Sequence, residues 1–379
     1  MIETFIEIAG TIENAYVREW KEKGGQIIGY PCSYLPEEVI YAAGMLPFRL
    51  RGVGTTSLSI GDTYFGPVIC SFPKCILQLA GERRYPFLDG VIIVPGCDSM
   101  RRLDECWRKC GEDYEGVLPG YFHYFGVPHK VTDYSIEWFE EETAALIGSI
   151  EDHFHVSLSE DDLKGAVDSC NESRVLLKQL NDLRCGEQVP VTGAETLAIV
   201  IAGFSMPRNE YNLLLRQFLS GAEEREDVAG GKKRLLLVGS VIDDLDFIRV
   251  IEECGAVVVG DTLCFGARSY DDMVDAGEPP VKALARRYLN HASCPRMFGY
   301  YKERYHYLRE KIGAVRADGV ILQNIRFCDL HGSENGIFER DLEAEGIPCM
   351  RLEREYGPLV ESGRLRMRID AFMERLASR

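Results

Sequence analysis

The sequence predicts an α/β protein with parallel sheets in two related halves. Short apolar runs alternate with stretches of helical spacing, a pattern typical of repeated β-α winding. The segment Asp89–Ile92 returns as Asp318–Ile321, and each copy leads within a few residues into a Cys-Asp pair. The chain of 379 residues is also longer than one hydrophobic core usually holds. We therefore expect two α/β domains.

In the first half, the expected elements place cysteines at strand-to-helix junctions. Cys32 follows a strand and precedes a helix that opens with Pro36 and two acids, Glu37 and Glu38, whose expected role is to complement the helix dipole. Cys70 lies near the amino end of another helix, where the dipole lowers a thiol pKa. The expected elements are a helix over 1–24 ended by two glycines, a strand over 26–30, helices over 35–43 and 75–79, a strand over 91–94 leading to Cys97, and a helix over 100–109.

The middle of the chain is predicted to be helical and the remainder to return to β-α winding. Residues 136–224 are charged and lack clear strands, with a helical hairpin expected over 157–184 and a helix over 208–226. The elements expected after them are strands over 234–240, 256–259 and 319–322, and helices over 243–254, 281–288 and 301–311. The predicted domains are therefore an N-terminal α/β domain over 1–135, a helical insert over 136–232 and a C-terminal α/β domain over 233–379.

Composition excludes several classes of protein. A net charge of −17 and a pI near 5.0 would repel phosphate backbones, so no nucleic-acid partner is expected. No apolar stretch approaches the roughly 20 residues of a membrane span, and the amino terminus lacks the order of a signal peptide. We expect a soluble, cytoplasmic protein without membrane contact. In that reducing compartment the 13 cysteines are buried thiols or metal ligands rather than a disulfide framework.

Six cysteines differ from the other seven by their context. Each follows a strand or begins a helix, three in each half: Cys32, Cys70, Cys97, Cys264, Cys294 and Cys328. The remaining cysteines have no matching position in the other half, and we expect them to be ordinary thiols: Cys75, Cys106, Cys110, Cys170, Cys185, Cys254 and Cys349. No Cys-x-x-Cys pair occurs, which argues against a zinc ribbon or a contiguous ferredoxin-type site. From the residues alone, the six either converge on one iron-sulfur site or are core thiols.

Other motifs point away from nucleotide chemistry. The segment Gly52-Val53-Gly54 lacks the third glycine of a dinucleotide turn, and no phosphate-binding loop with the Gly-x-x-x-x-Gly-Lys-Ser/Thr pattern occurs, so this chain is not expected to hydrolyse ATP. Three histidines are candidate proton donors, although a structural role is the alternative for each: His331, His123 and His129.

Four segments carry a resemblance to a known family. They are Gly29–Glu38 continued by Ala42–Pro47, Cys97–Arg102, Cys264–Arg268 and Phe327–Asp329. Together they resemble the 2-hydroxyacyl-CoA dehydratase D-component family, which also contains ATP-dependent benzoyl-CoA reductase subunits and double-cubane-cluster proteins. The resemblance spans nearly the whole chain. One departure is Ser71, which follows Cys70 where many relatives have proline.

The resemblance implies a fold, a cofactor and partners. It implies two flavodoxin-like (Rossmann-like) domains around an iron-sulfur cluster, either a 4Fe-4S cubane or a double-cubane 8Fe-9S cluster. All six cysteines of the pattern are present, so three thiolates are available for each of two cubanes. A separate ATP-hydrolysing iron-sulfur activator would inject one electron at low potential, and His331, His123 or Tyr34 would donate protons at the catalytic site.

Three functions stay open at this point. The chain is a subunit of an enzyme that reduces or dehydrates a CoA thioester, as a heterodimer with a related subunit. Alternatively, it is a homodimeric double-cubane reductase of small unsaturated molecules. The third alternative is a non-catalytic electron-relay subunit, whose acidic surface would bind the activator.

Overall fold

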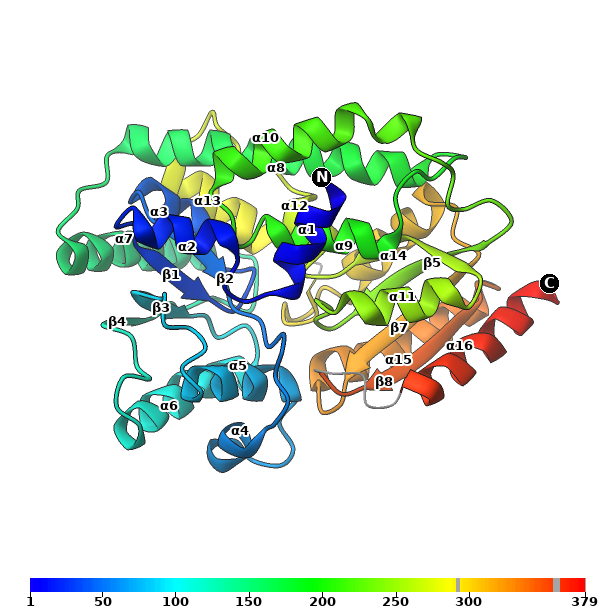
Figure 1. Ribbon diagram of the computed structural model, residues 1–379, viewed down its shortest axis with the longest axis horizontal. Coiled ribbons are helices and arrows are strands. Elements are labelled where there is room, and N and C mark those ends of the chain that lie inside the picture. The colour runs from blue at the N-terminus through cyan, green and yellow to red at the C-terminus, as the bar shows by residue number, and fades with distance from the viewer. Residues whose placement is uncertain (291–293, 357–361, 379) are drawn as a thin grey trace.

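A computed structural model describes residues 1–290, 294–356 and 362–378, and it contains two four-stranded parallel sheets (Figure 1). The strand orders are β2-β1-β3-β4 and β6-β5-β7-β8, and each neighbouring pair is parallel. In both sheets the first strand lies between the second and the third, which is the flavodoxin-like order. The prediction of two flavodoxin-like α/β units is therefore confirmed.

The first sheet lies on the left of Figure 1 and consists of short strands. Its central strands β1 and β3 are buried along their whole length, as expected for a parallel sheet covered on both faces. The strands are β1 (Ile27–Tyr30), β2 (Leu46–Arg49), β3 (Gly90–Ile93) and β4 (Tyr121–Tyr124). The helices of this half are α1 (Ile2–Gly10), α2 (Ala15–Glu22), α3 (Glu37–Ala42), α4 (Ser59–Tyr64), α5 (Ser71–Gly81) and α6 (Asp98–Asp113).

The single helix expected over 1–24 is wrong, because the chain forms α1 and α2 with a break between them. Thr11 adopts an extended conformation, and the side chain of Asn14 accepts a hydrogen bond from the backbone N–H of Val17. An asparagine with this geometry is a helix N-cap, so a new helix starts there. The apolar spacing that predicted one helix continues across the break.

Four helices lie between the two sheets in sequence. They are α7 (Asp133–Phe154), α8 (Glu160–Cys185), α9 (Gly193–Ala202) and α10 (Arg208–Ser220), the last followed by the 3₁₀ turn η1 (Ala222–Glu224). Two of them, α8 and α10, pack together along both halves. The hairpin expected over 157–184 is wrong: α8 is one continuous helix that begins at a capping box of Ser159 and Asp162. Helix α8 packs against α3 of the first half and β6 of the second, and α8 and α10 run across the top of Figure 1.

The second sheet lies on the right of Figure 1, and its strands are longer than those of the first. They are β5 (Lys233–Gly239), β6 (Ala256–Thr262), β7 (Gly319–Ile325) and β8 (Cys349–Arg354). The helices are α11 (Leu245–Glu253), α12 (Ala267–Tyr270), α13 (Pro280–Asn290), α14 (Tyr301–Ala314), α15 (Asp329–Ala344) and α16 (Ser362–Ala377).

Helix α13 belongs to the second half in sequence but packs on the first half. It lies against α7 and α8, and Leu284 and Leu289 share an apolar cluster with Ile28 of β1 and Ile92 of β3. The segment after it stays there, because Arg296 donates hydrogen bonds to the backbone carbonyls of residues 95, 127 and 128. The chain that carries Cys294 therefore crosses to the first half before it returns to the second sheet.

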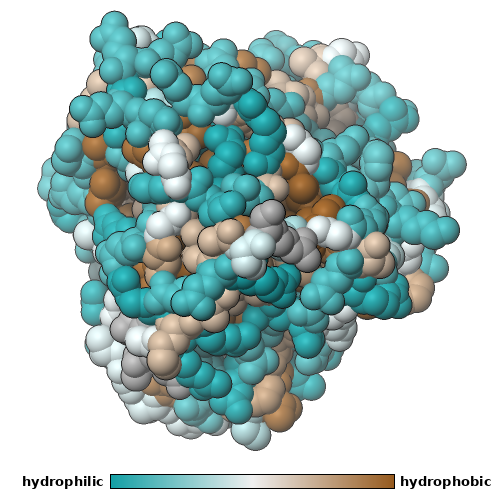
Figure 2. Space-filling view, turned by 90° about the vertical axis from the view of Figure 1, so that its right-hand side faces the viewer, coloured by the Kyte–Doolittle hydropathy of each residue, from teal (hydrophilic) through white to brown (hydrophobic). Residues whose placement is uncertain are grey.

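Hydrophilic side chains cover most of the face beside the second sheet, and apolar ones form small separate patches there (Figure 2). This distribution agrees with the strongly acidic composition. Within the described ranges, no helix is both long and apolar enough to cross a membrane.

Candidate functional site

The six singled-out cysteines lie at or near the carboxyl ends of the two sheets, where α/β folds bind ligands. Cys32 and Cys97 follow β1 and β3, the neighbouring strands at the topological switch point of the first sheet. Cys264 and Cys328 follow β6 and β7 of the second sheet. Cys70 and Cys294 come from loops that the other elements bring to this region.

The six thiols influence one another electrostatically, so the fold brings them together. Cys294 acts on the thiols of Cys32, Cys97 and Cys328. Cys70 is influenced by Cys97 and Cys328, and Cys264 acts on Cys328. Cysteines that are up to about three hundred positions apart in sequence thus share one region between the halves. Their role as ligands stays a prediction.

The cysteines divide by local structure into two groups of three, and each group contains cysteines of both halves of the sequence. One group, which we call the Cys97 triplet, consists of Cys70, Cys97 and Cys328, which each precede a helix. Cys97 and Cys328 act on Cys70, while Cys294 acts on both Cys97 and Cys328, so the triplet borders Cys294. The other group, the Cys294 triplet, consists of Cys32, Cys264 and Cys294. In it Cys32 is influenced by Cys294, and both Cys264 and Cys294 lie beside the guanidinium of Arg268. The mixing follows from the crossing of the Cys294 segment to the first half.

Each member of the Cys97 triplet is the N-cap residue of a helix. Cys70 precedes α5, Cys97 precedes α6 and Cys328 precedes α15. The backbone amides of the first turns lower the pKa of these thiols, for example that of Met100 for Cys97 and that of His331 for Cys328. Amides directed at a sulfur stabilise its thiolate and are a means of tuning an iron-sulfur cluster.

The loops that present the thiols are shaped by specific local contacts. Phe327, before Cys328, has a φ of 63°, which is a strained conformation for a bulky residue and tightens the turn after β7. Oδ1 of Asp261 accepts the N–H groups of Leu263 and Ala267 at 3.0 and 2.8 Å, so the Cys264 loop wraps around this carboxylate. A Cβ added to Gly96 would lie 2.6 Å from Sγ of Cys32, so only glycine leaves room for that thiol.

Ser71, the departure from the family pattern, has a structural partner in the second half. Its Oγ donates to Glu355 at 2.8 Å and accepts the backbone N–H of Tyr356 at 2.9 Å. A proline at this position has no hydroxyl group and could make neither of these hydrogen bonds. The serine thus joins the helix that begins at Cys70 to the end of the second sheet.

Burial keeps four of the six thiols protonated when no metal is bound. It raises the pKa of Cys32 and Cys97 to about 12, that of Cys328 to about 11, and that of Cys70 further still, and neighbouring thiols add to the shift. Thiolates at this site therefore require a cation to stabilise them, either a bound metal or a positively charged side chain.

Buried arginines stand beside the Cys294 triplet. Arg49 and Arg296 are only 1% and 3% exposed, and both favour the thiolate form of Cys32. In the part of the chain that the structure describes, neither has a carboxylate within ion-pair distance, and Nε of Arg49 has no hydrogen-bond partner. Burying a guanidinium without an anion is strongly unfavourable, so an anionic group is expected between them.

The donor types at this site are those that hold an iron-sulfur cluster. Among residues 1–290, 294–356 and 362–378, no three His, Cys, Asp or Glu side chains are arranged to hold a single ion. In a cubane the cysteines bind different iron atoms, so they stand farther apart than the ligands of a mononuclear zinc site. Six thiols, inward-facing amides and buried cations are the groups that an anionic iron-sulfur cluster requires.

Of the predicted proton donors, Tyr34 lies deepest in the site. It is fully buried beside Cys32 and Cys294, with the guanidinium of Arg296 5.0 Å from its ring centre. Burial raises its pKa well above the usual range, so its hydroxyl keeps its proton. The catalytic role of Tyr34 stays a prediction.

The histidines occupy different environments. His331 lies in the first turn of α15 after Cys328, and burial together with nearby arginines lowers its pKa well below 6.5, so its ring is neutral. His123 lies on β4, 3.3 Å from Oγ of Ser149 and stacked on Tyr121 rather than against a cysteine. Nδ1 of His129 is 3.3 Å from the carbonyl of Arg296, in the Cys294 segment.

Glu37 and Glu38, expected to complement a helix dipole, also form a buried network. Glu38 pairs with Arg174 of α8 at 2.5 Å and accepts the hydroxyl of Tyr288 at 2.8 Å. Glu37 pairs in a similar way with an arginine of α10 and accepts the hydroxyl of Tyr30, which precedes Cys32. Sequence reasoning missed this network because its arginines lie more than a hundred residues away.

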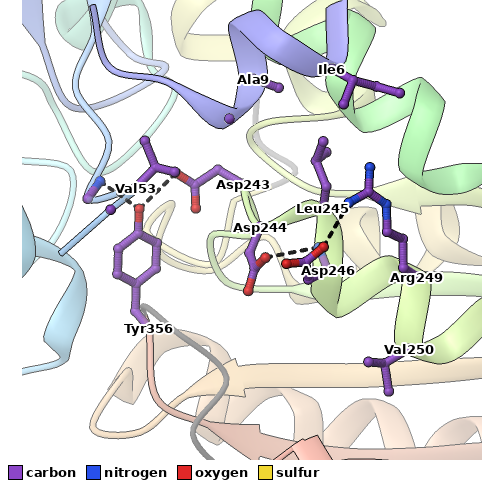
Figure 3. Close-up of a pocket in the computed structure, with 13 residues that line it drawn as sticks. Ile6, Ala9, Val53, Asp243, Asp244, Leu245, Asp246, Arg249, Val250 and Tyr356 are labelled. Atoms are coloured by element: carbon purple, nitrogen blue, oxygen red, sulfur yellow. Dashed lines mark hydrogen bonds and ion pairs between the residues drawn. The ribbon is translucent and has the colours of Figure 1, made fainter. Parts of the chain in front are cut away.

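A separate cavity of about 530 Å³ lies between the two halves (Figure 3). It is lined by α1, the Gly52–Gly54 loop after β2, Asp243 and Asp244 after β5 and the first turns of α11, and none of the six cysteines lines it. The hydroxyl of Tyr356 donates to Asp243 and accepts the N–H of Gly52, both at 2.7 Å. The cavity is therefore a second concave surface at the domain junction, distinct from the cysteine site.

The fold and the site define a class: a two-lobed α/β protein with six thiols gathered at the junction of its flavodoxin-like units. The chain belongs to the 2-hydroxyglutaryl-CoA dehydratase D-component family, whose model matches residues 32–376. The resemblance inferred from the motifs is thereby confirmed.

Curated relatives cover most of their own length and of this chain. A benzoyl-CoA reductase subunit from Thauera aromatica is 29% identical over 322 residues, 82% of this chain and 81% of the relative. The β subunit of (R)-phenyllactyl-CoA dehydratase from Clostridium sporogenes is 26% identical over 98% of both chains. The β subunit of (R)-2-hydroxyglutaryl-CoA dehydratase from Acidaminococcus fermentans is 21% identical over 93% of both. Relatives thus include dehydratase and reductase subunits.

Proposed function

We propose that this chain is an iron-sulfur subunit of an enzyme that reduces or dehydrates a CoA thioester. Its six cysteines hold the cluster, and a separate ATP-hydrolysing activator supplies low-potential electrons in the cytoplasm. The observation that carries the proposal is the convergence of six thiols beside two buried arginines that have no carboxylate partner in the described residues. The partner is a related subunit, as the names of the relatives support.

The number of convergent cysteines favours two cubanes over one. Three thiolates for each cubane match a double-cubane 8Fe-9S cluster, whereas one 4Fe-4S cubane would leave several of the six cysteines unused. This observation also supports the second candidate function, a homodimeric double-cubane reductase of small unsaturated molecules. A related but different chain that copurifies supports the first function, and homodimerisation supports the second.

Each residue of the site has a physical task in this proposal. The cluster, when bound, supplies one-electron chemistry at low potential. The cysteines bind as thiolates, and the N–H groups of Met100 and His331 stabilise two of them. The guanidiniums of Arg49 and Arg296 offset the negative charge, while the hydroxyl of Tyr34 holds a proton beside Cys32.

Iron and sulfide content tests the proposal. In anaerobically purified protein, Cys97→Ala and Cys294→Ala should each lose iron and the brown absorbance, because each removes a ligand. Cys170→Ala is the matched control, since Cys170 is buried in α8 beside Arg208 and should leave the iron content unchanged. About eight irons per chain would indicate two cubanes and about four would indicate one. Full iron content in both ligand variants would refute the assignment.

A further inference from the structure

Cys294 differs from the other site cysteines in the way the fold holds it. It lies in the segment between α13 and α14 and caps neither helix, since the N-cap of α14 is Tyr300. Its thiol nevertheless acts on those of Cys32, Cys97 and Cys328, which belong to both groups of cysteines. The position of this thiol therefore depends on the contacts of the segment that carries it.

Arg296 fixes this segment to the first half of the chain. It follows Cys294 by two positions, and its side chain is only 3% exposed. Its Nε donates to the carbonyl of Pro95 at 3.3 Å. Its Nη2 donates to the carbonyl of Val127 at 2.5 Å, and its Nη1 donates to that of Pro128. One guanidinium thus binds both the loop after β3 and the loop after β4.

The loop after β3 borders two further site cysteines. Only Gly96 separates the carbonyl that Arg296 binds in this loop from Cys97. A Cβ added to Gly96 would lie 2.6 Å from Sγ of Cys32, so the same loop also lies against that thiol. Through this loop, Arg296 connects the segment of Cys294 to the surroundings of Cys97 and Cys32.

Backbone contacts on both sides keep the segment in this place. The carbonyl of Arg296 lies 3.3 Å from Nδ1 of His129, and the N–H of Phe298 donates to the carbonyl of His129 at 2.8 Å. On the side of the second half, Nη1 of Arg304 in α14 donates to the carbonyl of Met297 at 2.9 Å. The segment is therefore held between the two halves.

We propose that Arg296 is a positioning residue of the iron-sulfur site: its hydrogen bonds to three carbonyls hold the thiol of Cys294 against those of Cys32 and Cys97. The inference rests on the proposed function, in which these cysteines hold a cluster. A guanidinium is a planar fork of five N–H donors, so it can bind two loops at once in a fixed geometry. This role comes in addition to the charge of Arg296.

A lysine at position 296 distinguishes positioning from charge. Arg296→Lys keeps the positive charge, but a compact ammonium on a flexible stem cannot reproduce the fork that binds both loops. In the anaerobic, iron-loaded full chain, this variant should lose as much iron as Cys294→Ala, and its electron paramagnetic resonance spectrum should resemble that of Cys294→Ala. The original iron content and spectrum in Arg296→Lys would overturn the inference and leave the proposed function standing. An original chain without iron would overturn both.

Arg51 provides the matched control for the loss of a buried guanidinium. It is 2% exposed and donates to the carbonyls of Ala9 and Thr11, both at 2.8 Å, and it acts on Asp243 of the junction cavity. Arg51→Lys should lower the melting temperature but keep the iron content and the spectrum. Equal loss of iron in the Arg51 and Arg296 variants would overturn the inference, because the loss would then follow from general destabilisation.

A second variant keeps the test decisive if Arg296→Lys does not fold. His129 is exposed, so His129→Ala should fold, and it removes the contact with the carbonyl of Arg296. It should change the same part of the spectrum as Cys294→Ala, by a smaller amount. An unchanged spectrum of His129→Ala in that case would overturn the inference.

Discussion

Arg49 and Arg296 show at the scale of single residues why the cysteines belong to one site. Both are buried and act on the thiol of Cys32, and among the described residues neither forms an ion pair with a carboxylate. The sequence predicts the cysteines because their junctions recur in the two halves. It does not predict the arginines, because Arg49 ends an edge strand and only the folded chain brings it to Cys264 and Cys32.

Tyr34→Phe should impair proton supply without affecting cluster assembly. The hydroxyl is buried beside Cys32 and Cys294, so its loss should lower turnover by about 100- to 10,000-fold, the usual contribution of a positioned proton donor. Iron content should not change, because the cysteines remain. His123→Gln is the comparison, since His123 contacts Ser149 and Tyr121 and should have little effect on turnover. Full activity of the Tyr34 variant would remove this residue from the mechanism.

Asp243 in the junction cavity should make stability depend on pH. Burial raises its pKa, although Arg51 and the hydroxyl of Tyr356 oppose the shift. A carboxyl with a raised folded pKa contributes stability that is lost as pH rises through that value. Asp243→Asn keeps an acceptor for Tyr356 but does not titrate. The variant should therefore gain thermal stability relative to the original protein as pH rises from about 4 to 7.

Asp227 provides a control in which the pH dependence of stability should have the opposite sign. The backbone N–H groups of Val189 and Ala229 lower its pKa, so it contributes stability that is lost as pH falls through its folded pKa. Asp227→Asn should lose melting temperature relative to the original protein as pH rises. The same sign for both variants would contradict the assignment for Asp243.

At the scale of elements, the buried network on α3 connects this helix to three others. Glu37 and Glu38 connect α3 to α8 and α10, and Tyr288 adds α13, which leads toward Cys294. Tyr30, on the other side of Cys32, bonds to Glu37 at 2.7 Å. The network thus fixes the loop of Cys32 relative to the segment of Cys294.

Breaking this network should destabilise the protein more than breaking a surface pair. Burial alone would raise the pKa of Glu38, but Arg174 and Arg287 outweigh it and hold the pKa below its usual range. Glu38→Ala leaves a buried guanidinium without its carboxylate, which costs about 3–5 kcal/mol. Arg174→Ala should cost a similar amount. The double variant should cost less than the sum, as measured by denaturant unfolding.

The exposed pair Lys164–Glu160 on α8 is the matched control for that experiment. Nζ of Lys164 and Oε1 of Glu160 are 2.8 Å apart, and both side chains are about half exposed. Glu160→Ala should therefore lower the free energy of unfolding by no more than about 1 kcal/mol. Additive effects of the Glu38 and Arg174 changes would show that the two side chains act independently.

The errors in the element predictions have identifiable physical causes. The sequence does not predict strand β2 because Pro47 interrupts it, and a proline is accepted only on an edge strand such as this one. β4 is a half-exposed edge strand of only four residues, without an aliphatic run. By contrast, the sequence predicts β1, β3, β5, β6 and β7 close to their observed positions, because each is a continuous apolar run.

At the scale of the whole molecule, the internal repeat predicts two related units but not how they exchange segments. The repeated sheet order follows from the repeated Asp-Gly-Val-Ile strands, β3 and β7. The crossing of α13 and Arg296 to the first half depends on packing against residues far away in sequence, which no local pattern encodes. The domain boundaries after residues 135 and 232 stay a prediction.

The crossing of the Cys294 segment to the first half leads to a prediction. It distinguishes cysteines grouped by their position in space from cysteines grouped by their position in the sequence. If the triplets form as the fold places them, Cys97→Ala and Cys328→Ala should change the same part of the iron spectrum, although they lie in different halves. Cys32→Ala should resemble Cys264→Ala instead, since both border the buried arginines. Electron paramagnetic resonance of the four anaerobic variants measures this. If Cys97→Ala instead gave the same spectral change as Cys32→Ala, each half of the sequence would hold its own iron. Iron bound by cysteines of one half only would be affected equally by either change.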